Sequence, residues 1–152
     1  MNTANIEIKN ITNADRSAVL DMMEQLYYSP AVLTDTPRRV LQKCLDDAIR
    51  GLPQIEGYVL KADGEYAGYS LVAKGYTTEF GGICIQIEDL FILPAHRGKS
   101  IGTAFLRFIE DKYRGEAALL RLEVEPSNAN ALALYKKCGF NELPYTEMIK
   151  KL

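Results

Sequence analysis

The segment Ile87–Gly102 combines residue types that bind anions with residue types that move protons. It is predicted to hold the end of an apolar strand, a short loop and the beginning of a helix. The first turn of a helix has unpaired N–H groups and the positive end of the helix dipole, so it attracts anions. Gly98 and Gly102 let a ligand come close to the backbone, and Arg97 and Lys99 add positive charge. The segment is therefore predicted to bind phosphate groups.

Two neighbouring acids, Glu88 and Asp89, lie inside the apolar strand of that segment. A buried carboxylate loses its hydration and needs partners, so two acids are unusual at this place. Successive residues of a strand point to opposite faces, which places the two side chains on different faces of the sheet. Glu88 is the candidate catalytic residue, and the alternative is that its side chain simply faces solvent. No role is assigned to Asp89.

Known phosphate motifs narrow the possibilities for the loop. A P-loop needs a glycine five residues before the Gly-Lys-Ser that begins at Gly98, and Leu93 stands there instead. A dinucleotide fingerprint, G-x-G-x-x-G, is also absent from the segment. The pattern that remains is R-x-x-S-x-G, from Arg97 to Gly102.

The elements that position the loop follow from hydrophobic periodicity and turn residues. In chain order we predict a strand (6–11), two helices (15–27 and 36–49), three strands (58–61, 66–76 and 83–93), a helix from 101, a strand (119–124), a helix (128–138) and a last strand near 147–151. The order is β-α-α-β-β-β-α-β-α-β. The fold class is α/β (α+β), a mixed, mostly antiparallel sheet with helices on its faces, in which 83–93 and 119–124 are parallel neighbours.

Caps and turns support these boundaries. Asp15 is expected to cap the first helix, and Thr36 is expected to cap the second helix with Pro37 at its first helical position. Asp63-Gly64 is the strongest hairpin signal in the chain.

The loop and a second motif together resemble the GNAT superfamily of N-acetyltransferases. R-x-x-S-x-G is similar to the Q/R-x-x-G-x-G/A pyrophosphate loop of that family, except that Ser100 replaces the first glycine of that pattern. The segment 128–140 fits the pattern N-x-x-A-x-x-x-Y-x-x-x-G-F, in which Tyr135 is the tyrosine. The element order also matches, so the resemblance covers nearly the whole chain as one domain, 1–152. The Glu88 strand looks most like the polyamine and thialysine N-acetyltransferase branch.

The resemblance implies direct transfer of an acetyl group from acetyl-CoA to an amine. The amine must first lose a proton, because a Lys-like ammonium has a pKa of about 10.4. Glu88 is the candidate base, directly or through water. The departing thiolate needs a proton, for which Tyr135 is the candidate acid, because a thiol and a phenol have pKa values of about 8.5 and about 10. Without the motif, Tyr135 would be interpreted as a core aromatic residue.

The resemblance also implies which residues bind each substrate. The acetyl-CoA residues are Leu90, Phe91 and Ile92 for the pantetheine arm, Arg97, Gly98, Lys99, Ser100, Ile101, Gly102 and Thr103 for the pyrophosphate, and Asn128 and Tyr135. The acceptor residues are Glu88, Tyr27, Tyr28 and Asp35. Two alternatives stay open, because Asn128 could be only a helix cap and Tyr27 could be a core residue.

Ser100 is the departure from the family pattern that bears most on acetyl-CoA binding. If the loop needs a positive φ there, serine is strained by roughly 1–3 kcal/mol. Its hydroxyl could instead donate to a phosphate oxygen. The neighbouring His96 is expected to be a solvent-exposed loop residue without a chemical role.

The composition limits the partners of the protein. The 152 residues carry a net charge of −2, which does not suit a nucleic-acid partner. The three cysteines lack CxxC spacing, so neither a disulfide framework nor a metal site is indicated, and a cytoplasmic protein with reduced thiols is expected. No signal peptide or membrane-spanning run is found. The family resemblance allows a homodimer.

Three functions are compatible with these observations. The first is an N-acetyltransferase for a small-molecule amine such as a polyamine or an amino-acid analogue. The second is a peptide or protein N-acetyltransferase. The third is a non-catalytic acetyl-CoA-binding module, which the serine at position 100 slightly favours.

Overall fold

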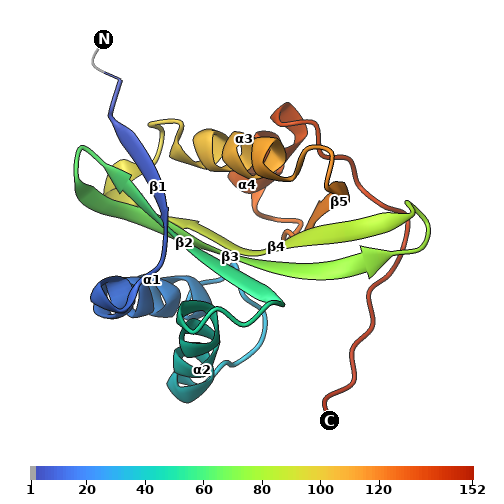
Figure 1. Cartoon of the computed structure of the whole chain (residues 1–152), viewed down its shortest axis with the longest axis horizontal. Helices are drawn as coiled ribbons and strands as arrows, with labels where there is room; N and C mark the ends of the chain where they lie inside the picture. Colours follow the sequence, from blue (N-terminus) through green and yellow to red (C-terminus); the bar gives the residue numbers. More distant parts are fainter. Residues whose placement is uncertain (1–2) are drawn as a thin grey trace.

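A computed structural model describes residues 3–152 of the chain (Figure 1). The elements are β1 (Ile6–Asn10), the 3-10 turn η1 (Asn13–Asp15), α1 (Arg16–Tyr27), α2 (Arg38–Ile49), β2 (Ile55–Ala62), β3 (Glu65–Thr77), β4 (Gly82–Ile92), the 3-10 turn η2 (Pro94–His96), α3 (Ile101–Tyr113), β5 (Ala117–Leu122) and α4 (Ala129–Lys137). The predicted order is confirmed up to the last helix. Within 3–152, no helix is long and apolar enough to cross a membrane.

The five strands form one sheet in the order β1-β2-β3-β4-β5. The first four are antiparallel, and β4 and β5 are parallel as predicted. Asp63 and Gly64 turn the chain between β2 and β3 with φ values of 51° and 84°. Two central residues with positive φ suit the right-handed twist of a two-residue hairpin.

The predicted strand at residues 147–151 is wrong. This segment pairs with no strand within residues 3–152, and the exposed fractions of Met148 and Ile149 are 90% and 79%. A short segment has little preference for a strand unless a neighbouring strand pairs with it. In Figure 1 the end of the chain runs away from the body of the molecule towards the C-terminus.

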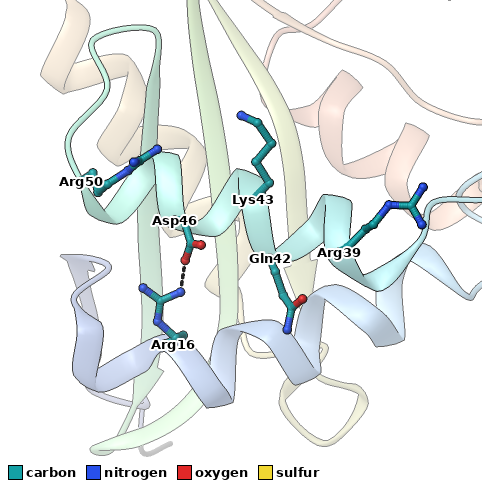
Figure 2. Close-up of a pocket in the computed structure, with 6 residues that line it drawn as sticks. All are labelled: Arg16, Arg39, Gln42, Lys43, Asp46 and Arg50. Carbon is teal, nitrogen blue, oxygen red and sulfur yellow. Dashed lines mark hydrogen bonds and ion pairs between the residues drawn. The ribbon is translucent and has the colours of Figure 1, made fainter.

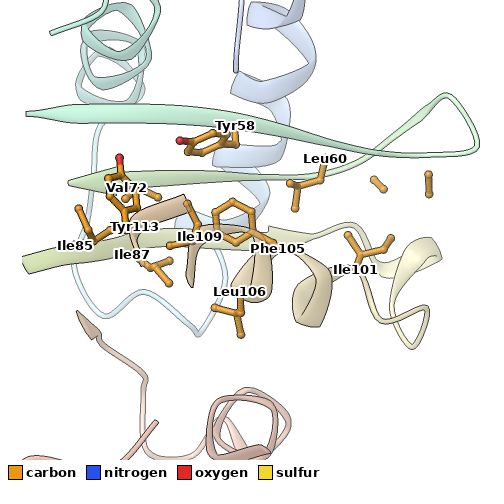
Figure 3. Close-up of a cluster of buried hydrophobic side chains, with 12 residues drawn as sticks. Tyr58, Leu60, Val72, Ile85, Ile87, Ile101, Phe105, Leu106, Ile109 and Tyr113 are labelled. Atoms are coloured by element: carbon orange, nitrogen blue, oxygen red, sulfur yellow. The ribbon is translucent and has the colours of Figure 1, made fainter. Parts of the chain in front are cut away.

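Helices cover both faces of the sheet, with α3 and α4 on one face and α1 and α2 on the other (Figure 1). The core under α3 is built by Ile101, Phe105, Leu106, Ile109 and Tyr113 against sheet residues that include Tyr58, Leu60, Val72, Ile85 and Ile87 (Figure 3). The core under α1 and α2 is built by residues that include Val19, Met23, Leu41, Leu45, Tyr69, Leu71 and Phe91. Each sheet face therefore buries its own apolar set.

The caps differ from the prediction at two helix starts. Asp15 does not cap α1 with its side chain, because its carboxylate accepts hydrogen bonds from the Thr12 backbone at 2.9 Å and from the Tyr66 hydroxyl at 2.8 Å. Thr12 and Asp15 form a capping box one turn earlier. The second helix begins at Arg38 with Pro37 as its N-cap residue, so neither Thr36 nor Pro37 takes the place predicted for it.

A polar cluster around Glu56 closes one end of the α3 core. Its carboxylate accepts hydrogen bonds from Tyr113 at 2.7 Å and from Tyr58, and pairs with Lys74 and Lys112 at 2.6 and 3.0 Å. Burial alone would raise the pKa of Glu56, but these four partners lower it to about 2. The carboxylate is therefore ionised and links β2, β3 and α3.

Candidate active site

A β-bulge in β4 shapes the centre of the candidate site. Asp89 lies opposite Leu71 of β3 and Ile87 lies opposite Val72, so Glu88 is one extra residue on β4. Because of this extra residue, Ile87 packs into the α3 core while the next odd-numbered positions, Asp89 and Phe91, face α1 and α2. The bulge thus changes which side chains of β4 point to each face.

Beyond the bulge, β4 separates from β5. The parallel pairing ends at Ile87 and Leu122, whereas β4 stays paired with β3 as far as Ile92 opposite Gly68. Along the described chain, the β5 side of residues 88–92 has no strand partner. A strand edge of this kind offers N–H and C=O groups to an extended ligand. Leu90, Phe91 and Ile92, the predicted pantetheine residues, lie on it.

The loop after β4 has the geometry of an anion site. Gly98 and Ser100 both have left-handed backbones, with φ values of 75° and 61°, and α3 begins directly after Ser100. The side chain of Ser100 makes no capping hydrogen bond to the helix. The first turn of α3, Ile101–Thr103, therefore presents its N–H groups beside exposed Arg97 and Lys99.

Arg97 also holds the loop against the end of β4. Its Nε donates a hydrogen bond to the carbonyl oxygen of Ile92 at 3.0 Å, and its guanidinium lies 5.8 Å from the centre of the Phe91 ring. Since only Nε is used, the terminal nitrogens keep their capacity to donate to a phosphate.

His96 differs from its predicted exposed position. The residue is half-buried, and its Nδ1 atom is buried without a hydrogen-bond partner among residues 3–152. It belongs to the 3-10 turn Pro94–His96, which directs it towards the protein. The sequence offered no periodic signal in so short a turn.

The second motif lies on α4. The side chain of Asn128 accepts a hydrogen bond from the backbone N–H of Ala131 at 3.2 Å, which confirms its capping role. Tyr135 is half-buried, packs against the α3 core, and meets the ring of Phe140 edge-on with 6.0 Å between centroids. Burial raises the pKa of Tyr135, so its hydroxyl is protonated at neutral pH.

Acidic side chains gather where β4 and β5 separate. Glu88 is exposed as a residue, but partial burial raises the pKa of its carboxyl, and the negative charges of Asp89 and Glu147 raise it further. Burial also raises the pKa of Glu123, with further contributions from Glu147 and Glu88. Glu123 follows β5, and Glu147 belongs to the C-terminal segment. Neither residue was predicted from the sequence, since only folding brings these three segments together.

Of the predicted acceptor residues outside β4, Tyr27 is the one with a hydrogen bond to β4. Tyr27 ends α1 and donates its hydroxyl to the carboxylate of Asp89, which follows Glu88, at 2.7 Å. Tyr28 and Asp35 are exposed in the connection between α1 and α2. Their roles stay predictions.

The hollow on the outer face of α1 and α2 is a separate feature (Figure 2). It measures about 520 Å³ and is lined by Arg16, Arg39, Gln42, Lys43, Asp46 and Arg50. Arg16 of α1 pairs with Asp46 of α2 across it. None of the predicted site residues lines this hollow, so it is not the candidate active site.

Separated strands beside a helix start with free N–H groups suit an enzyme that binds an extended, phosphate-bearing cosubstrate such as an acyl-CoA. Residues 20–140 match the Acetyltransferase (GNAT) family. The chain belongs to this family of acetyltransferases.

Three relatives show the range of acceptors in the family. The chain is 31% identical to an IAA acetyltransferase of Azospirillum brasilense over 134 residues, which is 86% of this chain and 84% of that protein. It is 38% identical over 80 residues to a streptothricin acetyltransferase of Streptomyces lavendulae (52% of this chain) and 32% identical over 95 residues to a thialysine N-epsilon-acetyltransferase of Bos taurus (59%). The matches span only 40% and 55% of the lengths of these last two relatives.

The fold also matches solved acetyltransferase structures. AAC(6')-Iy in complex with the bisubstrate analogue CoA-S-monomethyl-acetylneamine superposes with a TM-score of 0.79 at 14% identity, covering 97% of this chain and 99% of that one. At this identity the similarity concerns the fold alone. It confirms the predicted mixed sheet with helices on both faces.

Proposed function

We propose that the chain transfers the acetyl group of acetyl-CoA directly to the primary amine of a small, positively charged molecule, such as a polyamine or an amino-acid analogue. The observation that carries this proposal is the bulge at Glu88, which places a carboxylate of raised pKa where β4 and β5 separate. The neighbouring carboxylates of Glu123 and Glu147 add negative charge, which attracts a cationic acceptor.

In this mechanism Glu88 takes a proton from the ammonium group of the acceptor, directly or through one water. The amine nitrogen then bonds to the carbonyl carbon, and the bond from that carbon to sulfur breaks. Tyr135 gives its proton to the departing thiolate, and the second proton, which the nitrogen loses as the amide forms, returns to the Tyr135 oxygen directly or through water. The raised pKa values suit both roles, because Glu88 becomes a stronger base and Tyr135 stays protonated until the thiolate forms.

The loop and the free side of β4 supply the binding site for acetyl-CoA in this proposal. Arg97, Lys99 and the N–H groups of Ile101–Thr103 bind the pyrophosphate, with Gly98 and Ser100 shaping the turn. The backbone of Leu90–Ile92 binds the pantetheine arm, and one of its N–H groups polarises the thioester carbonyl. Asn128 orders the start of α4 and thereby the position of Tyr135.

An amine panel tests the proposal. Thiol release from acetyl-CoA would be followed with polyamines, lysine analogues, aminoglycosides and peptides with free N-termini. We expect small cationic amines to react and Glu88→Gln to abolish the rise of kcat/KM with pH. Acetylation of peptides alone would point to a peptide acceptor. Tight acetyl-CoA binding without turnover of any amine would instead identify a binding module.

We also propose that the protein forms a homodimer in the cytoplasm. The outer edge of β5 and the exposed apolar residues Met148 and Ile149 are available for pairing with a second copy. The cysteines are free thiols, which suits a reducing compartment. Light scattering of the full chain and of a variant without residues 145–152 tests the first point, and only the full chain is expected to be a dimer. Fractionation of cells that make the protein tests the second.

A further inference from the structure

Asp89 is the most deeply buried carboxylate described in the structure, with an exposed fraction of 4%. Its Oδ1 accepts a hydrogen bond from the hydroxyl of Tyr27 at 2.7 Å, and its Oδ2 accepts one from the hydroxyl of Tyr69 at 2.8 Å. Its backbone carbonyl accepts a third hydrogen bond, from the hydroxyl of Ser70 at 2.6 Å. The residue is thus held through both carboxylate oxygens and through its backbone.

This arrangement is unfavourable as a purely structural device. Asp89 forms no ion pair with any basic residue in the range 3–152. Burial raises its pKa, and the two tyrosine hydroxyls only partly offset that effect. An apolar side chain of similar size would fill the same space without desolvating a carboxylate. Packing alone therefore does not explain why an acid stands at position 89.

Its partners lie at the boundary between the reacting centre and the acceptor side. Asp89 directly follows the bulged residue Glu88, and the bulge turns its side chain towards α1 and α2. Tyr27 is the last residue of α1, and the exposed connection 28–37 to α2 follows it. The hydrogen bond from Tyr27 to Asp89 is consequently a direct polar link between the bulge and the start of this connection.

We propose that Asp89 is a positioning residue, which fixes the end of α1 against the β4 bulge and so sets the distance between Glu88 and the segment that contacts the acceptor amine. The choice of Glu88 as base rests on the proposed function, whereas the link between α1 and β4 does not. Loss of the link should loosen the end of α1 and weaken acceptor binding, and it should leave the loop that binds acetyl-CoA unchanged.

The chain offers a matched control at the other end of the same helix. The Tyr66 hydroxyl of β3 donates to Asp15, the residue before α1, at 2.8 Å. Tyr27→Phe and Tyr66→Phe each remove one tyrosine–aspartate hydrogen bond that joins α1 to the sheet. Only the first of these bonds lies beside Glu88, so the two variants separate positioning from general stability.

The experiment compares both variants, Asp89→Leu, whose side chain of similar size can neither accept nor donate a hydrogen bond, and the double variant Tyr27→Phe/Asp89→Leu in three measurements. Hydrogen exchange of residues 26–29 reports the link without requiring activity, and we expect it to be faster in Tyr27→Phe but not in Tyr66→Phe. The KM of the best amine from the panel should rise about five- to tenfold in Tyr27→Phe, as expected for the loss of one ordinary hydrogen bond. The Kd of acetyl-CoA should stay within about twofold of the wild-type value.

The double variant should be no worse than the more impaired single variant, since both changes remove the same link. Equal effects of Tyr27→Phe and Tyr66→Phe on the KM, or additive effects in the double variant, would overturn the proposal. Unchanged exchange in Tyr27→Phe would overturn it even if no amine is acetylated. If no amine of the panel is acetylated but hydrogen exchange of residues 26–29 is faster in Tyr27→Phe, the proposed function is refuted. The link between α1 and β4 is then still established.

Discussion

Gly102 and Leu134 bring the two motifs of the chain into contact. A methyl group added to Gly102 would lie 3.0 Å from Cδ2 of Leu134, which is closer than side chains normally pack. Gly102 therefore allows the start of α3 to approach α4, where Tyr135 follows Leu134. The glycine that was expected to admit phosphate also fixes the distance between the pyrophosphate loop and the candidate acid.

Ser100→Gly should stabilise the protein. Ser100 has a φ of 61°, a conformation that is unfavourable for residues other than glycine. We expect the free energy of unfolding to rise by about 1 kcal/mol, measured by urea denaturation. Calorimetry should show acetyl-CoA affinity equal to or higher than that of the wild type. A clear loss of affinity would show instead that the serine hydroxyl binds the pyrophosphate.

The matched control for that substitution is Gly98→Ala. Gly98 has a φ of 75°, and nothing lies within 4 Å of an added Cβ, so the substitution changes only backbone strain. It should lower the free energy of unfolding by about 1 kcal/mol. The change in the free energy of unfolding is therefore expected to be positive for Ser100→Gly and negative for Gly98→Ala.

Tyr135→Phe should lower kcat by about 100-fold, because the thiolate leaves without its proton donor. The Kd of acetyl-CoA should change little, since the ring and its contact with Phe140 are retained. A thiol-release assay measures kcat, and calorimetry measures the Kd of acetyl-CoA. Tyr145→Phe removes an exposed hydroxyl that donates to Glu79 and serves as the control with unchanged kcat. Equal kcat values for both variants would remove Tyr135 from the mechanism.

Glu147→Gln should move the acidic limb of the kcat/KM profile to lower pH. The charge of Glu147 contributes to the raised pKa values of Glu88 and Glu123, so its removal lets both acids ionise at lower pH. An acid whose pKa is raised on folding contributes stability below its ordinary pKa and loses that contribution as the pH rises. At neutral pH the variant should therefore be at least as stable as the wild type.

Glu142→Gln is the control for the effect of Glu147, because Glu142 lies in the same C-terminal segment and pairs with Lys136 instead. Its pH–rate profile should coincide with that of the wild type. If the acidic limb of the kcat/KM profile does not move in Glu147→Gln, the ionisation of Glu88 does not control that limb.

Glu56→Gln should lower the free energy of unfolding by about 2 kcal/mol at neutral pH, because four partners lose a charged acceptor. The pKa of Glu56 falls from 4.5 to about 2 on folding, so its contribution is complete above the first value and is lost as the pH falls towards the second. Wild-type stability should therefore drop over this interval more steeply than that of the variant. Denaturation curves at several pH values check this, with exposed Glu110→Gln as the control.

Local sequence signals determined the element order and both motifs of the site. Helical spacing in α3, the Asp63-Gly64 turn and the Asn128 cap depend on residues a few positions apart, so the sequence alone predicts them. The loop before α3 was predictable for the same reason, including the strain that Ser100 shows at a φ of 61°, whereas its binding of pyrophosphate stays a prediction.

Tertiary structure decided the features that depend on how distant segments pair. One extra residue at Glu88, set by the register with β3, turns Asp89 towards α1, and no local pattern of β4 contains that register. The predicted strand near Glu147 failed because a strand needs a paired neighbour, which this segment lacks in the part of the chain that the structure describes. Folding alone brings Glu88, Glu123 and Glu147 together, since they come from β4, the end of β5 and the C-terminal segment.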